Sequence, residues 1–187
     1  VLQTLGDDVI TIHGAKTIDN DLPESHHTPG FGSAALFNAT AVRNLALDIY
    51  SFSTVFKRNG DGVRFGTAPL TIYQVMGRDT GWLALATVFA KFNEKGRITR
   101  EIAPDIIWPA EIPFDDERFL YAVDDFLSKN GKAFVVVSEG VYKNIGGERK
   151  SLAELSGELR ADNHRHNEYG RAEAGSAAAY IAALAEK

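Results

Sequence analysis

Short apolar runs, rich in β-branched residues, alternate along the chain with longer segments in which apolar residues recur every three or four positions. The short runs predict strands, and the run 133–137 (AFVVV) is apolar throughout, as expected for a parallel strand covered on both faces. Strands are predicted at 9–12, 70–75, 106–108 and 133–137.

The longer segments predict helices, because a period of 3.6 residues places their apolar residues on one face. One follows Gly32 and Ser33, and another opens with acidic residues at 115–117, which complement a helix dipole. Strands that alternate with such helices indicate an α/β fold, with a parallel sheet and helices on both faces. Helices are predicted at about 33–50 and 80–92, from 114 onward and from about 175 to the end, with a loop at 57–69.

The composition fits a folded protein. The 187 residues are 44% hydrophobic and include 11 Phe and 2 Trp, which is enough to fill a core and to exclude wholesale disorder. The chain has no Cys, which excludes a disulfide framework, a thiolate metal site and a Cys nucleophile, and favours a cytoplasmic location. The net charge of −5, without a basic cluster, argues against nucleic acid or a membrane as the main partner.

The start of the chain bears on its organisation. It begins with Val1 rather than Met, without a signal region, and no apolar run approaches the roughly 18 residues that span a bilayer. We therefore expect residues 1–187 to form one region, without an internal boundary, of a longer or processed chain.

The densest polar cluster is KTIDND at 16–21, directly after the first predicted strand. Ligands of open α/β sheets bind outside the carboxyl ends of the strands, so the position suits a site. In phosphoryl transfer, one of the carboxylates of Asp19 and Asp21 can orient and deprotonate an acceptor hydroxyl, while the neighbouring Lys and a metal offset phosphate charge. The alternative is an Asx-rich turn in which Asp19 and Asn20 cap backbone N–H groups.

Polar residues also follow the later strands. Arg78 after the second strand, with Gly77 allowing close backbone approach, suits a phosphorylated ligand, although Arg78 could instead pair with Asp79 or another carboxylate. Glu139 after the last strand can accept hydrogen bonds from sugar hydroxyls or cap the next loop. The loop 28–33 (TPGFGS) could receive an anion at a helix N-terminus, or be an ordinary turn. Because parallel strands end at one edge, we expect these clusters to converge on a phosphorylated small molecule.

At these residues the chain resembles the 6-phosphofructokinase family. The similar blocks occur in the family's order and at its spacings over about residues 5–160. They are KTIDNDL at 16–22, TPGFGSAA at 28–35, MGR at 76–78 with GWLA at 81–84, EIPFD at 111–115 and VVVSEG at 135–140. The first looks like the active-site signature and MGR looks like the sugar-phosphate motif. The resemblance implies the α/β fold of phosphofructokinases, incomplete in this chain.

The resemblance also implies an activity, the transfer of a phosphoryl group to the 1-hydroxyl of fructose 6-phosphate. Asp19 would take the proton from that hydroxyl, and Thr17 and Asp21 would position the sugar and the transferred group. Fructose 6-phosphate would be held by Met76, Gly77, Arg78, Glu139 and Arg171. Mg²⁺ is implied as the partner of the transferred group, with its ligands mostly outside this chain, and a homo-oligomer is implied too.

Lys16 indicates the phosphoryl donor. ATP-dependent members of the family generally have Gly there, whereas the diphosphate-dependent type has Lys. A long cationic side chain would occupy the region of a nucleotide's α-phosphate and would pair with the end of a free diphosphate. The resemblance therefore predicts diphosphate as the donor, in a nearly reversible reaction that yields fructose 1,6-bisphosphate.

Three departures from the family pattern keep alternatives open. The family's Gly-Gly-Asp donor loop does not occur in the chain, Pro69 stands where the family often has an Arg that reaches a neighbouring subunit, and Arg171 replaces a His. One alternative is a non-catalytic regulatory subunit or sensor that binds sugar phosphate. Another is a phosphotransferase on a related scaffold with a non-hexose acceptor.

Overall fold

The computed structural model describes residues 14–51, 53–55, 64–66, 69–92, 95–97, 103–161 and 175–186. At its centre lies a three-stranded sheet in the order β3–β5–β4, with both outer strands parallel to β5. Strand β3 spans Leu70–Val75, β4 spans Ile106–Trp108 and β5 spans Ala133–Ser138. The predictions at 70–75, 106–108 and 133–137 are confirmed, and the strand predicted at 9–12 lies outside the described residues.

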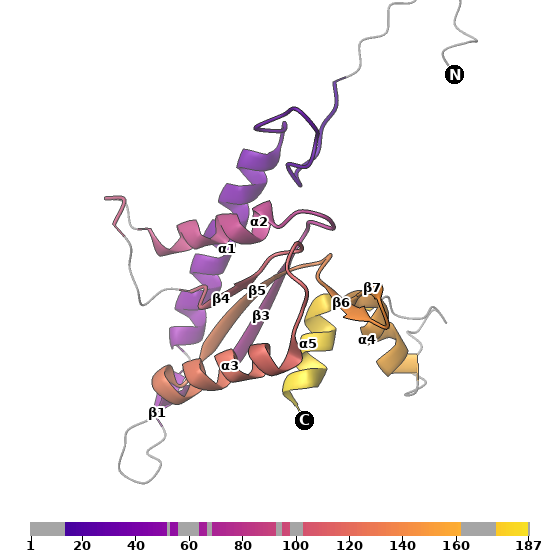
Figure 1. Cartoon of the computed structure of the whole chain (residues 1–187). Coiled ribbons are helices and arrows are strands. Elements are labelled where there is room, and N and C mark those ends of the chain that lie inside the picture. The colour runs from indigo at the N-terminus through magenta and orange to yellow at the C-terminus, as the bar shows by residue number, and fades with distance from the viewer. Residues whose placement is uncertain are drawn as a thin grey trace, which may run out of the picture.

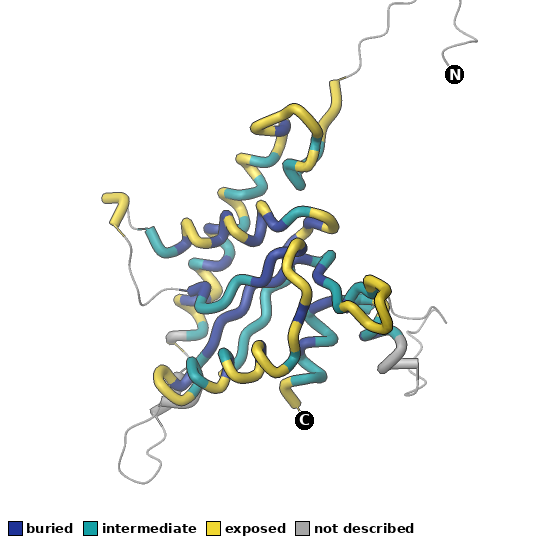
Figure 2. The backbone as a smooth tube through the Cα atoms, in the orientation of Figure 1, coloured by how far each residue is buried: buried dark blue, intermediate teal, exposed yellow. Residues whose placement is uncertain are grey.

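Strand β5 is buried along its whole length and separates two layers of helices (Figures 1 and 2). Its side chains alternate between the layers, because successive residues of a strand point to opposite faces. Phe134 and Val136 pack with one cluster, which also holds apolar residues of three helical segments. These segments are α1 (Phe31–Ser51), α2 (Trp82–Ala86) and the 3₁₀-helix η2 (Thr87–Lys91).

On the other face, Val135 and Val137 pack in a second cluster, with Trp108 of β4. Three further helices contribute to it: α3 (Asp116–Asn130), α4 (Leu152–Ala161) and α5 (Ala177–Ala185). Helices on both faces of a parallel sheet confirm the α/β class and the positions of the predicted helices. In the part of the chain that the structure describes, no helix is both long enough and apolar enough to cross a membrane.

The loop predicted at 57–69 is wrong at its centre. Strand β2 (Arg64–Gly66) pairs antiparallel with β1 (Ser53–Val55). A strand of three residues can pair through its backbone without an apolar pattern, so the Gly and charged residues of this stretch gave no sign of β2. The helix predicted at 80–92 is real but tightens to 3₁₀ geometry after Ala86, where the Thr87 hydroxyl donates to the carbonyl of Ala84 (2.6 Å).

Three elements that follow β5 were not predicted. A hairpin joins β6 (Tyr142–Ile145) and β7 (Glu148–Ser151), and α4 follows it directly. Gly146 and Gly147 form the turn with φ of 61° and 87°. Two consecutive residues at positive φ are what a two-residue hairpin turn of the favoured hand requires, so this Gly pair was a usable signal.

Helix α3 begins and ends at residues suited to those positions. The Asp115 carboxylate accepts a hydrogen bond from the Arg118 N–H (2.8 Å), and two acidic residues occupy the first turn. At the other end, Gly131 adopts the left-handed conformation (φ 71°) and its N–H donates to the Leu127 carbonyl (2.8 Å). The helix therefore starts one residue after its acidic cap.

Asp115→Ala should lower the free energy of unfolding by about 1 kcal/mol, because it leaves the first-turn N–H groups without their cap. Urea denaturation of the purified protein measures this change. Asp124→Ala is the matched control, since Asp124 is exposed within the same helix. Equal stability of the two variants would contradict the capping role.

Candidate functional site

The carboxyl ends of β3 and β5 meet at one edge of the sheet. Their parallel register pairs Val75 with Ser138, so the loops that follow leave the sheet side by side. The hydrogen bonds continue past the strands, from Glu139 N–H to the Val75 carbonyl (2.9 Å) and from Gly140 N–H to the Gly77 carbonyl (3.1 Å). Two of the predicted clusters are thus joined through the backbone.

The two glycines make this approach possible. A Cβ on Gly140 would lie 1.8 Å from the Arg78 carbonyl oxygen, and one on Gly77 would lie 2.4 Å from that of Thr80. Gly77 also has φ +127°, which side-chain-bearing residues rarely adopt. The backbone at Arg78 therefore runs directly against the Glu139–Gly140 turn. Among the described residues Arg78 forms no ion pair with Asp79, so the structural pairing considered for it is not observed.

The turn at 16–21 is held by its own side chains and by the next loop. The Thr17 hydroxyl accepts from the Asp19 N–H (3.1 Å), and the Thr28 hydroxyl donates to the Thr17 carbonyl (2.7 Å). Asn20, at φ 58°, accepts from the Thr28 N–H (2.9 Å). The Asx-turn interpretation is therefore right for Asn20. It is wrong for Asp19, whose buried Oδ1 has no hydrogen-bond partner among the described residues.

A threonine connects this turn to the loop after β3. The Thr80 hydroxyl donates to the backbone carbonyl of Asp19 at 2.7 Å, across 61 positions of sequence. The next residue is held as well, because the Gly81 N–H donates to Glu111 Oε1 (2.9 Å). Three loops from distant parts of the sequence thus meet at one place. Sequence patterns missed Thr80, because nothing local marks the distant carbonyl that its hydroxyl reaches.

The pKa of Asp19 also shows that charged side chains from several loops lie near it. Burial raises the pKa of its carboxyl above the ordinary 3.8, and the nearby carboxylates of Asp21, Glu139 and Asp79 raise it further. The Arg78 guanidinium acts in the opposite direction on this pKa. The structure therefore brings together the acidic and basic side chains that the sequence placed after separate strands.

Lys16 lies beside the start of α1. A Cβ on Gly30 would be 3.1 Å from Lys16 Cε and 3.9 Å from its Nζ, and the first helical hydrogen bond runs from Ala34 N–H to the Gly30 carbonyl (3.1 Å). First-turn N–H groups lack acceptors within a helix and attract anions. An ammonium at this helix start adds a full positive charge. The exposed end of the Lys16 side chain is thus available to an anionic ligand.

Two further predicted site residues are not joined to these loops by the contacts described above. Met76 follows β3 and is 54% exposed, and Arg171 lies outside the described residues. In the described ranges, no three His, Cys, Asp or Glu side chains gather as they would to hold a metal ion. The Mg²⁺ site, whose ligands are expected mostly outside this chain, stays a prediction.

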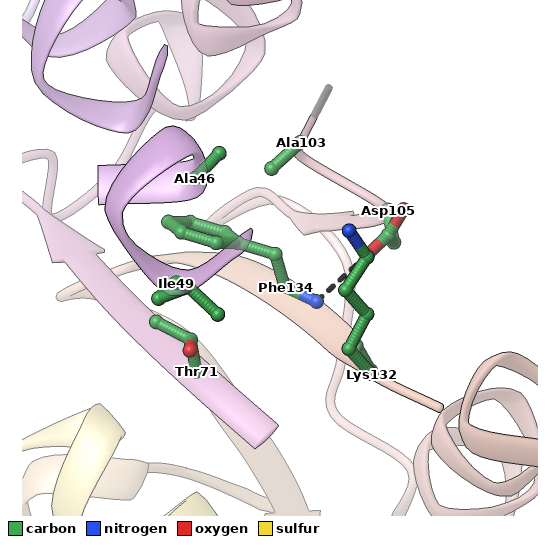
Figure 3. Close-up of a pocket in the computed structure, with 8 residues that line it drawn as sticks. Ala46, Ile49, Thr71, Ala103, Asp105, Lys132 and Phe134 are labelled. Atoms are coloured by element: carbon green, nitrogen blue, oxygen red, sulfur yellow. Dashed lines mark hydrogen bonds between the residues drawn. The ribbon is translucent and has the colours of Figure 1, made fainter. Parts of the chain in front are cut away.

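A small pocket of about 20 Å³ lies elsewhere, at the amino ends of β3 and β5 (Figure 3). Burial lowers the pKa of Lys132 there to about 8, and Asp105 Oδ2 accepts from the Phe134 N–H (2.8 Å). Its lining includes Thr71 and Phe134, which are register partners near the start of each strand. It is therefore separate from the loops at the carboxyl edge.

The structure defines an α/β protein with loops converging at one sheet edge, and comparison with known proteins gives its family. A family model described as Phosphofructokinase matches residues 2–185. The chain belongs to the phosphofructokinase family, as its motifs predicted. This membership covers nearly the whole of the chain.

Individual proteins to which the chain is similar support this family membership. The pyrophosphate–fructose 6-phosphate 1-phosphotransferase of Methylococcus capsulatus is 33% identical over 182 residues, which are 97% of this chain and 37% of that protein. The sulfofructose kinase of Alkalicoccus urumqiensis is 35% identical over 129 residues, 69% of this chain and 29% of that protein. A crystal structure of the pyrophosphate-dependent phosphofructokinase from Nitrosospira multiformis matches with a TM-score of 0.57 at 34% identity, covering 87% of this chain and 37% of that one. The chain spans about a third of the length of these proteins.

The raised pKa of Asp19 predicts a stability effect. Because the folded protein holds this proton more tightly than the unfolded chain does, ionisation of Asp19 at neutral pH destabilises the fold. Asp19→Asn should therefore raise the Tm at pH 7, and the gain should shrink as the pH falls toward 3.8. Thermal denaturation between pH 4.5 and pH 7 measures both effects. Asp124→Asn, on the exposed face of α3, should show neither, and a lower Tm for Asp19→Asn at pH 7 would contradict the prediction.

Proposed function

We propose that the protein carrying this chain transfers a phosphoryl group from diphosphate to the 1-hydroxyl of fructose 6-phosphate, giving fructose 1,6-bisphosphate. One observation carries the proposal: Asp19, half-buried and with a raised pKa, lies near Arg78 and Glu139 where three loops converge. An acceptor hydroxyl requires a base at such a point, and a sugar phosphate requires a cation and hydrogen-bond acceptors. The names of the relatives supply the substrate class.

Asp19 would act as the general base. Its buried Oδ1 has no hydrogen-bond partner among the described residues, so the carboxylate is not engaged in the structure through this oxygen and can take the proton of the attacking hydroxyl. A base becomes more effective as its pKa approaches the working pH, and burial together with Asp21 and Glu139 moves the pKa of Asp19 in that direction. The catalytic turn stays in place meanwhile, because its backbone is bonded by Thr17 and Thr80.

Arg78 and Glu139 would hold the acceptor sugar. The guanidinium can bind the 6-phosphate through paired hydrogen bonds, and the carboxylate can accept hydrogen bonds from sugar hydroxyls. Their backbones contact each other through Gly77 and Gly140, so the two groups keep a fixed separation. Thr17 and Asp21, at the same turn as Asp19, would position the sugar and the transferred group.

Lys16 would bind the donor. Its ammonium lies at the start of α1, where the helix dipole also favours an anion, and a small diphosphate can be held there without a nucleotide pocket. Mg²⁺, when bound, would neutralise charge on the transferred group. A homo-oligomer and a cytoplasmic location stay predictions of the sequence, as does a role for Arg171.

Asp19→Asn should lower kcat about 10²–10⁴-fold, the usual contribution of a general base, with little change in KM for fructose 6-phosphate. The assay couples fructose 1,6-bisphosphate formation to NADH oxidation, in the protein expressed at its full natural length. Asp124→Asn is the control. Normal turnover by Asp19→Asn would exclude Asp19 as the base, and wild-type protein that binds fructose 6-phosphate in calorimetry without turnover would support the sensor instead.

The same assay separates the acceptors and donors. Fructose 6-phosphate should be used in preference to 6-deoxy-6-sulfofructose, and diphosphate in preference to ATP. A preference for the sulfonated sugar would place the protein with its sulfofructose kinase relative.

Lys16→Met should lower kcat/KM for diphosphate about 10- to 100-fold, because one hydrogen bond to a charged group contributes about 1.5–3 kcal/mol. Affinity for fructose 6-phosphate should not change. Lys129→Met is the control, since Lys129 pairs with Asp125 on the outside of α3 (2.6 Å). Unchanged diphosphate kinetics would remove Lys16 from the donor site.

A further inference from the structure

We propose that Thr80 is a positioning residue that sets the placement and the burial of Asp19 through their hydrogen bond. This inference rests on the function proposed above. The Thr80 hydroxyl donates to the Asp19 carbonyl at 2.7 Å, and Thr80 is two residues from Arg78. Among the described residues, this hydrogen bond joins the loop that would hold the sugar phosphate to the turn that would supply the base.

The position of Thr80 is itself fixed from both sides. The Thr80 carbonyl packs against Gly77, where a Cβ would lie only 2.4 Å from the carbonyl oxygen. On the other side, the Gly81 N–H is held by Glu111 Oε1 (2.9 Å), and a Cβ on Gly81 would lie 2.2 Å from Pro109 Cβ. Because this segment is fixed relative to β3, the hydrogen bond from the Thr80 hydroxyl also fixes the position of Asp19 relative to β3.

Apart from Thr80, the turn meets the sheet through an apolar contact, since Ile18 packs against the cluster that holds Val75 and Phe134, and such a contact is not directional. The hydrogen bonds of Thr17, Asn20 and Thr28 connect the turn to itself and to the loop before α1. They fix the shape of the turn but not its distance from Arg78. Without the Thr80 donor, water would satisfy the Asp19 carbonyl, and the turn could shift with its internal hydrogen bonds intact.

Two measurable consequences follow. A displacement of the base of the order of 1 Å from the acceptor hydroxyl can cost about 10²-fold in rate, so kcat should fall while sugar-phosphate affinity holds. Water that reaches Asp19 would reduce its desolvation, which is the largest cause of its raised pKa. The acid limb of the pH–rate profile, where the base becomes protonated, should then move to lower pH.

Thr80→Val removes the donor with little change of shape, and Thr80→Ser retains it. In the full-length protein, we expect Thr80→Val to lower kcat about 10- to 100-fold and to shift the acid limb of kcat/KM to lower pH. Its Kd for fructose 6-phosphate, from calorimetry without donor, should stay within about threefold of wild type, since tenfold would correspond to about 1.4 kcal/mol. Thr80→Ser should restore kcat and the pH profile.

Thr40→Val is the matched control, because the Thr40 hydroxyl also donates to a backbone carbonyl, that of Leu36 within α1 (2.8 Å), outside the converging loops. It should keep wild-type kinetics. Thr80→Ala serves as a second variant if Thr80→Val does not fold. Loss of the folded state in both would overturn the proposal, because the hydroxyl would then act on stability alone.

The outcomes also separate this proposal from the proposed function. Active wild-type protein with an unchanged kcat and pH profile in Thr80→Val would overturn the role of Thr80 alone. A reduced kcat with an unmoved acid limb would overturn it as well, since Asp19 would have kept its burial. Wild-type protein without phosphotransferase activity would overturn the proposed function, and the role of Thr80 with it.

Discussion

The parallel pairing of β3 with β5 is the constraint on which the candidate site depends. It brings two loops, each carrying a charged residue, to one edge of the sheet. The pairing is stabilised by burial, since Val135, Val136 and Val137 have no exposed surface. Full burial of each such side chain contributes about 1.5–3 kcal/mol, more than one exposed polar contact at the sheet edge contributes. The core thus supplies the rigidity that the polar loops cannot supply themselves.

Burial alone does not set the register of this pair. Residues on both faces of β5 are buried, so this strand lacks the alternation of apolar and polar residues that fixes the register of a half-buried strand. The contacts at the strand ends are specific instead. At one end Ala133 N–H donates to the Pro69 carbonyl (2.7 Å), and at the other Gly140 N–H donates to the Gly77 carbonyl (3.1 Å). Since only Gly fits at 140 against the Arg78 carbonyl, the contact that fixes the register also fixes Arg78 beside Glu139.

The sequence predicted those features that depend on local pattern. The strands of the sheet were visible because their residues are apolar, and the candidate loops were visible because Gly and charged residues follow each strand directly. The division of roles between Asp19 and Asn20 was not predictable, because either side chain can cap a turn and only the fold leaves Asp19 Oδ1 without a partner. Thr80 was hidden for a similar reason, since its acceptor lies 61 positions away. Strand β2 was not predicted, because backbone pairing over three residues requires no particular side-chain pattern.

The turn at 16–21 explains why its two interpretations are compatible. Among the described residues, the hydrogen bonds that hold it do not use the Asp19 carboxylate: Asp19 N–H donates to Thr17, the Asp19 carbonyl accepts from Thr80, and Asn20 caps the next loop. The turn is therefore stable without help from the carboxylate, which stays partly buried near like charges at a cost to the fold. A purely structural turn would use so well placed a carboxylate as a cap, because an unbonded buried oxygen costs about 1–3 kcal/mol. Its lack of a bond favours a role in which the partner arrives with the substrate.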